Sequence, residues 1–339
     1  MIPVLPPTPA NLRLAADRLA QGELVAFPTE TVYGLGAHAL RPEALARIFE
    51  AKKRPFFDPL IVHVGNRSGL DRICARIDAK AERLMDRFWP GPLTLVLPKT
   101  DLVPDLATSG LPTVAVRMPD HPVALGLLRA AGFPVAAPSA NPFGRLSPTE
   151  ARHVSAHFEE GIALILDGGP CAVGVESTIL SLEGETPTIL RAGGLAREDI
   201  EAVIGPVGVA AAPAGAGADP GRPLAPGQLP SHYAPRTPLR LLPGTAPASP
   251  EATGRGTPGM RVGLLAFRGA PAQAAYASVE ILSPTGDLRQ AAANLFASLH
   301  RLDSRGLDLI LAEPIPETAL GLAIMDRLRK AAAAAVTGF

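Results

Sequence analysis

The chain has 339 residues, and 47% of them are hydrophobic, which predicts a core of ordinary depth divided between two domains. Lys plus Arg and Asp plus Glu both total 32, so no net charge draws the protein to nucleic acid, and small ligands are favoured. Two distant cysteines exclude a disulfide scaffold, and the lack of a signal-peptide pattern or an apolar stretch of about 18 residues predicts a cytoplasmic protein with no membrane contact.

The first two hundred residues alternate between helical and strand patterns. Apolar residues at helical spacing in residues 11–22 precede residues 23–36, which we expect to form a short strand ending in a Gly-bearing turn. An amphipathic helix follows at residues 43–54. Several later strands are too uniformly apolar to have a solvated face, which predicts an α/β domain with a largely covered sheet. These strands span residues 58–64, 92–98, 113–119, 134–140, 162–169, 176–182 and 187–194, with helices at residues 78–89 and 121–132.

The composition changes after residue 206, where the larger predicted domain, residues 1–206, ends. Residues 207–238 are dense in Ala, Pro and Gly and nearly empty of large apolar side chains, so we predict a linker. Residues 239–339 alternate strands and helices again and look like a small Rossmann-like domain without a GxGxxG turn. The strands expected there span residues 238–243, 260–267, 278–284 and 307–314, and the helices lie around residues 270–277, 286–302 and 318–334.

Three basic residues, Lys52, Lys53 and Arg54, stand at the end of the second predicted helix. Cations in this position can hold phosphate oxygens, and arginine is suited to bidentate contacts. An isolated basic group is more often a solvated helix end, where cations interact favourably with the helix dipole. The segment alone leaves both interpretations open.

Small polar residues form a second group. Ser139 and Asn141 lie between two prolines in the segment APSANPFG, directly after an apolar strand. In α/β sheets, ligands bind beyond the carboxyl ends of the strands, so this turn is a candidate ligand site. A purely structural turn uses the same residue types.

Hydroxyl residues alternate with other residues in the segment FPTETVYGLG. In an extended strand, Thr29, Thr31 and Tyr33 would project to one side and could line a pocket for a small polar substrate. The alternative is that the threonines are present only because threonine favours the β-conformation, here at a sheet edge. The glycines of this segment lack the pattern of a Walker or dinucleotide loop.

Further polar residues stand at or near the ends of apolar strands. Arg117 and Arg191 need an anion or a path to solvent, whereas a lone histidine such as His63 is more often a core residue with satisfied ring nitrogens than a ligand-binding group. Ser177 lies in a similar position. The sequence has no Ser-His-Asp order, no HExxH and no dense set of acids, so positioning and charge stabilisation of a phosphate are favoured over covalent catalysis.

Eight short motifs follow one another within about residues 8 to 205. In this order they resemble the YrdC/Sua5 family of L-threonylcarbamoyladenylate synthases, whose product serves the threonylcarbamoyl modification of adenosine 37 in tRNA. SHYAP and the C-terminal region resemble the longer Sua5 form. The resemblance implies a YrdC-like open twisted α/β domain joined by a Pro/Gly/Ala-rich linker to a smaller Rossmann-like Sua5 domain. The motifs are PTETVYGLG, KxR at Lys52 and Arg54, PLIVHV, WPGPLTLVL, VAVRMPDHP, SxN at Ser139 and Asn141, GVESTI and ILRAGG.

The resemblance implies a nucleotidyltransferase that uses L-threonine, bicarbonate or CO2, and ATP with Mg2+, and whose product passes to the tRNA threonylcarbamoyl transferase machinery. The catalytic cations would be Lys52 and Arg54. Threonine would bind at Thr31, His63, Arg117, Ala137 and Ser177. ATP would bind at Lys52, Arg54, Thr113, Ser139, Asn141, Ser147 and Arg191, with Asp58 next to the phosphates and with His232 and Tyr233 of the linker closing over the nucleotide.

Two features depart from the family pattern. Asp58 stands where relatives often have Asn, and its carboxylate would repel phosphates unless Mg2+ or a neighbouring cation intervenes. The linker before His232 is also less basic than in relatives. The alternative functions are an RNA-binding YrdC-like module without synthase activity, with weak RNA binding, and a carbamoyl transferase of hydrogenase maturation. The latter embeds this domain in a longer chain with zinc-finger cysteines, which are absent here.

Overall fold

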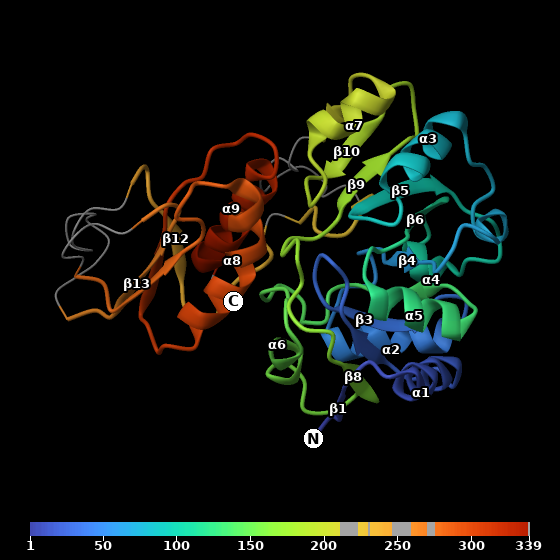
Figure 1. Cartoon of the computed structure of the whole chain (residues 1–339), viewed down its shortest axis with the longest axis horizontal. Helices are drawn as coiled ribbons and strands as arrows, with labels where there is room; N and C mark the ends of the chain where they lie inside the picture. Colours follow the sequence, from blue (N-terminus) through green and yellow to red (C-terminus); the bar gives the residue numbers. More distant parts are fainter. Residues whose placement is uncertain (211–222, 230, 246–258, 270–274, 338–339) are drawn as a thin grey trace.

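The computed structural model describes residues 1–210, 223–229, 231–245, 259–269 and 275–337. They form two α/β parts that lie side by side, coloured blue to yellow and orange to red in Figure 1. Within this described part, no helix is long and apolar enough to cross a membrane.

The larger part is built on a mixed sheet. Among the described residues, the sheet has eleven strands in the order β1-β8-β2-β3-β7-β4-β6-β5-β9-β10-β11. Strand β4 pairs with β6 in parallel and with β7 antiparallel, which brings His63 beside Arg117. The strands are β1 (Val4–Leu5), β2 (Val25–Phe27), β3 (Gly34–His38), β4 (Ile61–His63), β5 (Leu93–Pro98), β6 (Thr113–Arg117), β7 (Val135–Ala136), β8 (Leu164–Leu166), β9 (Thr178–Ser181), β10 (Thr188–Arg191) and β11 (Gly208–Val209).

Helices cover this sheet. Helix α1 begins after Thr8, whose hydroxyl accepts a hydrogen bond from the backbone amide of Asn11. This helix packs against α5. Helix α2 ends at Lys52, and Lys53 then takes a left-handed conformation with φ of 51°. This end of α2 fixes the start of the segment that carries Arg54. The helices are α1 (Pro9–Ala20), α2 (Pro42–Lys52), the 3-10 helix η1 (Leu70–Arg72), α3 (Ala79–Phe88), α4 (Asp105–Thr108), α5 (Pro122–Ala131), α6 (Ala151–Ser155) and α7 (Arg197–Ile204).

The smaller part has a parallel sheet in the order β12-β15-β13-β14. Its elements are β12 (Leu239–Leu241), β13 (Val262–Ala266), β14 (Ser278–Ile281), α8 (Leu288–Asp303), β15 (Leu309–Ala312) and α9 (Gly321–Thr337). This arrangement agrees with the expected small Rossmann-like domain. The helix expected around residues 270–277 falls mostly outside the described residues.

The two parts share a hydrophobic core. Val32, Leu146 and Val175 of the larger part pack in one cluster with Leu295 and Phe296 of α8. A stack of imidazoles lies at the same interface, where the rings of His153 and His300 are 3.9 Å apart and 14° from parallel. The smaller part is therefore docked on the larger one through buried side chains.

The predicted strand at residues 23–36 is wrong in one respect. Strands β2 and β3 form an antiparallel pair, and residues 28–33 are the loop between them. Gly34 and Gly36 lie in β3, where a Cβ on Gly36 would come within 2.9 Å of the Phe27 ring. These glycines allow neighbouring strands to pack closely, and they do not form a turn.

The proposed division at residues 206 and 238 remains a prediction. Strand β11 of the first sheet reaches Val209, and the second sheet starts with β12 at Leu239. Residues 211–222 and 230 of the predicted linker lie outside the described residues. The linker residues that are described include the buried pair His232 and Tyr233.

Candidate functional site

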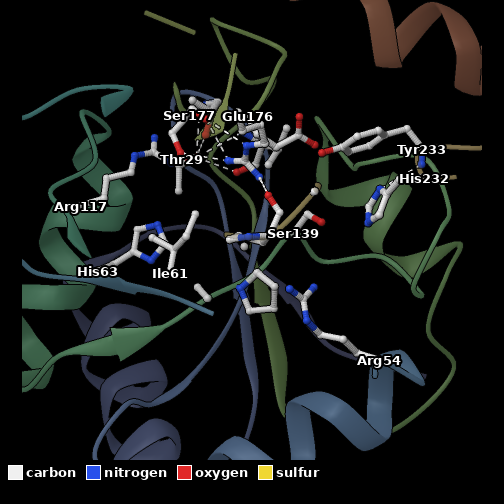
Figure 2. Close-up of a pocket in the computed structure, with 18 residues that line it drawn as sticks. Thr29, Arg54, Ile61, His63, Arg117, Ser139, Glu176, Ser177, His232 and Tyr233 are labelled. Carbon is white, nitrogen blue, oxygen red and sulfur yellow. Dashed lines mark hydrogen bonds between the residues drawn. The ribbon is translucent and has the colours of Figure 1, made fainter. Parts of the chain in front are cut away.

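A pocket lies where the β2–β3 loop, the end of β4, the end of β6 and the turn after β7 meet the linker. Figure 2 shows Arg117, His63 and Ile61 on one side of it, His232 and Tyr233 on the other, and Ser139 between them. Eleven of the sequence-predicted residues line this pocket: Thr29, Thr31, Arg54, His63, Arg117, Ala137, Ser139, Ser177, Arg191, His232 and Tyr233.

Lys52 is buried just behind the pocket wall. Its ammonium donates to the carbonyl oxygen of Ser139 at 2.6 Å and to that of Asn141, so α2 holds the turn after β7. Burial lowers the pKa of Lys52 well below its ordinary value, and the nearby Arg54 acts in the same direction. The Asn141 amide donates to Pro142 and Arg145, while its Oδ1 has no partner among the described residues.

Arg191 enters the pocket from the end of β10. Its guanidinium donates to the Ser177 carbonyl at 2.9 and 3.2 Å and to the Pro226 carbonyl at 3.3 Å. Burial lowers its pKa. Within the described ranges, neither Arg191 nor Lys52 forms a salt bridge with a carboxylate. Two buried cations are thus held only by neutral groups, an arrangement that favours an anionic ligand.

Asp58 pairs with a cation on its own loop. The Arg54 guanidinium lies 2.8 Å from the Asp58 carboxylate and also donates to the carbonyls of Asp58 and Pro59. Burial raises the pKa of Asp58, and Arg54 opposes that rise. A neighbouring cation therefore offsets the negative charge that stands in place of the usual Asn.

Arg117 is also paired. Its guanidinium lies 2.6 Å from the carboxylate of Glu30, and its Nε donates to the Gly91 carbonyl at 3.2 Å. Both partners are buried. A ligand carboxylate at Arg117 must share or replace Glu30, which the sequence patterns did not identify.

His63 is a neutral imidazole at this end of the pocket. Burial, and then the charge of Arg117, lower its pKa to about 3. Nδ1 has no hydrogen-bond partner in the part of the chain that the structure describes. The imidazole can therefore donate a hydrogen bond to a ligand, or accept one from it, without adding a charge to the pocket.

The hydroxyls of the β2–β3 loop do not share one side. Thr29 and Thr31 line the pocket, and their hydroxyl oxygens are 2.8 Å apart. Tyr33 points into the core, where its hydroxyl donates to the Gly169 carbonyl at 2.8 Å. The alternation expected for a strand fails because these residues form a loop.

Glu176 and Ser147 form a buried polar pair beside the pocket. The Ser147 hydroxyl donates to one oxygen of Glu176, and the Arg327 guanidinium of α9 donates to the other at 2.8 Å. Burial acts to raise the pKa of Glu176, but Arg327 and Arg191 hold it below its ordinary value. Glu176 lines the pocket and is next to Ser177, whose hydroxyl lies 2.8 Å from that of Thr94.

The linker closes one side of the pocket. Tyr233 takes a left-handed conformation with φ of 62°, which is uncommon for an aromatic residue and marks a locally constrained backbone. The His232 ring packs edge-on against Phe143. Gly227 fits between Tyr233 and Arg191, since a Cβ there would lie 2.7 Å from the tyrosine hydroxyl and 3.0 Å from Cδ of the arginine.

Some predicted residues do not reach the pocket wall. Lys52, Asp58 and Ser147 contact the wall residues Ser139, Arg54 and Glu176 through the bonds described above, and the backbone amide of Asn141 donates to the Ser139 carbonyl at 3.0 Å. Thr113 lies at the other end of β6 from Arg117 and does not line the pocket, although alternation places both on one face of the strand.

The sequence also gave no role to two acids at the pocket. Glu30 and Glu176 occur in the segments PTETVYG and GVESTI, each close to a residue that was singled out. A carboxylate within an apolar segment needs a buried partner, and this signal could have found both. Their actual partners, Arg117 and Arg327, come from distant segments.

Two other chemistries lack support in the described residues. No group of three or more His, Cys, Asp or Glu side chains is arranged to hold a metal ion. Burial raises the pKa of Cys74 to about 12, and it also raises that of Cys171. Both thiols are therefore protonated at neutral pH and poor nucleophiles.

Comparisons with known proteins cover both parts of the chain. Residues 17–193 match the Sua5/YciO/YrdC family, described as "Telomere recombination", and residues 195–333 match "Threonylcarbamoyl-AMP synthase, C-terminal domain". Threonylcarbamoyl-AMP synthase of Bacillus subtilis is 46% identical over 324 residues, which are 94% of this chain and 92% of that protein. The enzyme of the same name from Pyrococcus abyssi is 44% identical, over 95% of this chain and 94% of its own length. A crystal structure of P. abyssi Sua5 with L-threonine superposes with a TM-score of 0.88 at 43% identity, covering 98% of this chain and 96% of that one.

Proposed function

This chain belongs to the Sua5/YciO/YrdC family of threonylcarbamoyl-AMP synthases, and from that premise we propose that it makes L-threonylcarbamoyladenylate and pyrophosphate from L-threonine, bicarbonate or CO2, and ATP. The observation that carries the proposal is the pair of buried cations, Lys52 and Arg191, without carboxylate partners in the described residues. They adjoin a pocket that is also lined by the neutral imidazole of His63 and by the hydroxyl residues Thr31 and Ser177.

The reaction needs two bond-forming steps. The threonine ammonium loses a proton, and the resulting amine adds to CO2 and releases a second proton to give a carbamate. A carbamate oxygen then attacks the α-phosphorus of ATP, and the bond to the leaving pyrophosphate breaks. Such a reaction requires positioning and charge stabilisation but no protein nucleophile. The protonated, buried thiols of Cys74 and Cys171 are consistent with this chemistry.

Threonine is assigned to the end of the pocket with His63 and Arg117. The guanidinium of Arg117 can bind the substrate carboxylate, and the neutral ring of His63 can accept a hydrogen bond from the substrate. Thr31, Ala137 and Ser177 also line the pocket, and we assign them to the same substrate. A mixture of small polar and apolar side chains suits an amino acid that carries both a hydroxyl and a methyl group.

The phosphates of ATP are assigned to the end with Lys52, Arg54 and Arg191. Pyrophosphate gains charge as it leaves, so cations placed beside it stabilise the transition state more than the ground state. The nearby acids Asp58 and Glu176 are each engaged by an arginine. We therefore propose that Mg2+ enters the pocket bound to the phosphates of ATP, and that no site made of carboxylates holds it beforehand. His232 and Tyr233 would close over the nucleotide.

The product is an activated carbamate, and we propose that it passes to the machinery that modifies adenosine 37 of tRNA. A cytoplasmic location and weak RNA binding remain predictions. If RNA binds, its affinity will fall as salt rises, because contacts to phosphates release counterions.

The test is pyrophosphate formation from ATP, measured with and without L-threonine and bicarbonate. Pyrophosphate that forms only when both are present supports the proposal, and identification of the adenylate by mass spectrometry completes it. Pyrophosphate release that is independent of threonine, or absent in all mixtures, contradicts the proposal.

A further inference from the structure

The C-terminal domain reaches the pocket through one arginine. Arg327 lies in α9 and is 1% exposed. A guanidinium buried to this degree must find charged or polar partners, because its desolvation is costly. Its partners come from three segments: Glu176 of the larger domain, Tyr233 of the linker and Asp326 of its own helix.

The first contact is with a pocket residue. Nε of Arg327 lies 2.8 Å from Oε2 of Glu176, across 151 positions of sequence. The other carboxylate oxygen of Glu176 accepts a hydrogen bond from the hydroxyl of Ser147. The side chain of Arg327 is fully buried and that of Glu176 is 7% exposed, so water does little to screen the pair.

The second contact is with the linker. The Arg327 guanidinium lies over the Tyr233 ring, 4.9 Å from its centroid, and an arginine over an aromatic face is attracted to it. One turn further along α9, Lys330 donates to the Gly227 carbonyl at 2.6 Å. The same face of α9 therefore contacts the linker at two residues of the pocket wall, Tyr233 and Gly227.

The charges around the pocket indicate what these contacts of Arg327 do. Three buried acids adjoin the pocket, and each has an arginine: Asp58 has Arg54, Glu30 has Arg117, and Glu176 has Arg327. The first two pairs lie within the larger domain, whereas the third is completed from the C-terminal domain. Asp58 is the acid that acts on Lys52, and Glu176 is the acid that acts on Arg191, so their pairing with Arg54 and Arg327 leaves the charge of the two cations available to an anion.

We propose that Arg327 is a positioning residue for nucleotide binding: it neutralises and orients Glu176 and holds Tyr233, so that the C-terminal domain completes the ATP site. Without Arg327, the carboxylate of Glu176 faces the pocket uncompensated. It then repels the phosphates or pairs with Arg191, and either effect weakens ATP binding. This inference rests on the proposed function, because the anion it concerns is ATP.

The experiment compares full-length variants by calorimetric titration with ATP and by threonine-dependent pyrophosphate formation. Arg327→Met should weaken ATP binding by about tenfold or more, the usual scale for a lost charged contact, and should change the KM for threonine less. Arg329→Met is the matched control, because Arg329 lies on the same helix, is 53% exposed and pairs with Glu317 of its own domain. It should stay within about twofold of the wild type.

A charge rescue separates this role from a merely structural one. If Arg327 acts by compensating Glu176, then Glu176→Gln combined with Arg327→Met should bind ATP more tightly than Arg327→Met alone, although less tightly than Glu176→Gln alone, because the contact with Tyr233 is still lost. A double variant that binds no better than Arg327→Met would overturn the inference, as would an Arg327→Met variant that matches the Arg329→Met control.

Two further measurements keep the outcome decisive. If Arg327→Met does not fold, Arg327→Lys, which keeps the charge, should retain most of the ATP affinity, and its loss of binding would contradict the electrostatic role. The wild type serves to separate the two proposals. A wild type that neither binds ATP nor forms pyrophosphate refutes the proposed function, whereas an active wild type with an unaffected Arg327→Met variant refutes only this inference.

Discussion

The two ends of the pocket differ in how their buried cations are compensated. At the end with His63, the cation Arg117 already has a carboxylate, Glu30, at 2.6 Å. Lys52 and Arg191, by contrast, are held only by carbonyl and hydroxyl groups within the described residues. An anion that reaches either of these two cations gains its charge without displacing a carboxylate. Arg117 can accept a substrate carboxylate only in competition with Glu30.

The largest effect is expected where the cations have no carboxylate partner. Lys52→Met or Arg191→Met should reduce threonine-dependent turnover by about 100-fold or more, because each removes a charge that meets the phosphates in the transition state. Turnover and ATP binding measured side by side provide the check. Lys53→Met is the control, since Lys53 is exposed although it is adjacent in sequence. Equal effects at positions 52 and 53 would refute the contrast.

A smaller, more selective effect is expected at the paired end. Arg117→Met should raise the KM for threonine by about 100-fold and change the KM for ATP little, since a hydrogen bond between charged groups is lost. It also leaves Glu30 buried and unpaired, which should cost about 3 to 5 kcal/mol of folding free energy.

The double variant Arg117→Met with Glu30→Gln sharpens this prediction. It should regain much of the stability, because no uncompensated charge remains, but it should not regain threonine binding. Denaturant unfolding and kinetics on the same preparations measure both quantities. Recovery of threonine binding in the double variant would show that Arg117 does not contact the substrate.

A substrate change tests the same end without a mutation. Valine has the shape of threonine but lacks its hydroxyl, so the polar groups around Thr31 and His63 would be left unpaired. We expect valine to support pyrophosphate formation about tenfold less well than threonine. Comparison of kcat/KM for the two amino acids under saturating ATP tests this expectation, and equal values would exclude a hydroxyl-binding pocket.

The last prediction concerns the histidine stack away from the pocket. Burial lowers the pKa of His153 to about 3 and that of His157 to about 4, and it also lowers that of His300. A depressed pKa in the folded state means that the stabilising contribution is present above the unfolded value of about 6.5 and is lost as pH falls below it. The charged groups that act on these rings are Lys52, Glu150, Arg152, Arg236, Arg301 and Asp303.

Thermal unfolding between pH 7.5 and 5 tests this prediction. The free energy of unfolding should fall by at most about 1.4 kcal/mol per pH unit for each histidine that stays neutral in the folded state. His300→Asn should weaken the dependence, because it removes one ring of the stack. A pH dependence that is unchanged in this variant would show that other groups cause it.

The sequence patterns predicted much of the fold because they depend on local order. Apolar runs such as residues 93–98 and 262–266 are strands, and helical spacing in residues 288–303 gives a helix. The motifs around Lys52, Ser139 and Ser177 identified segments that meet at one pocket. The β2–β3 loop was predicted incorrectly, since alternation of residues does not distinguish a strand from a hairpin loop.

The sequence by itself determined the two α/β patterns, the family and the residue types at the site, because each of these depends on residues that are close together in the sequence. Only the tertiary structure decided which charges cancel. Glu176 pairs with Arg327 across 151 positions, and Lys52 reaches Asn141 across 89. Electrostatic pairing depends on distance through space and on exclusion of water, and neither quantity can be read from the order of residues.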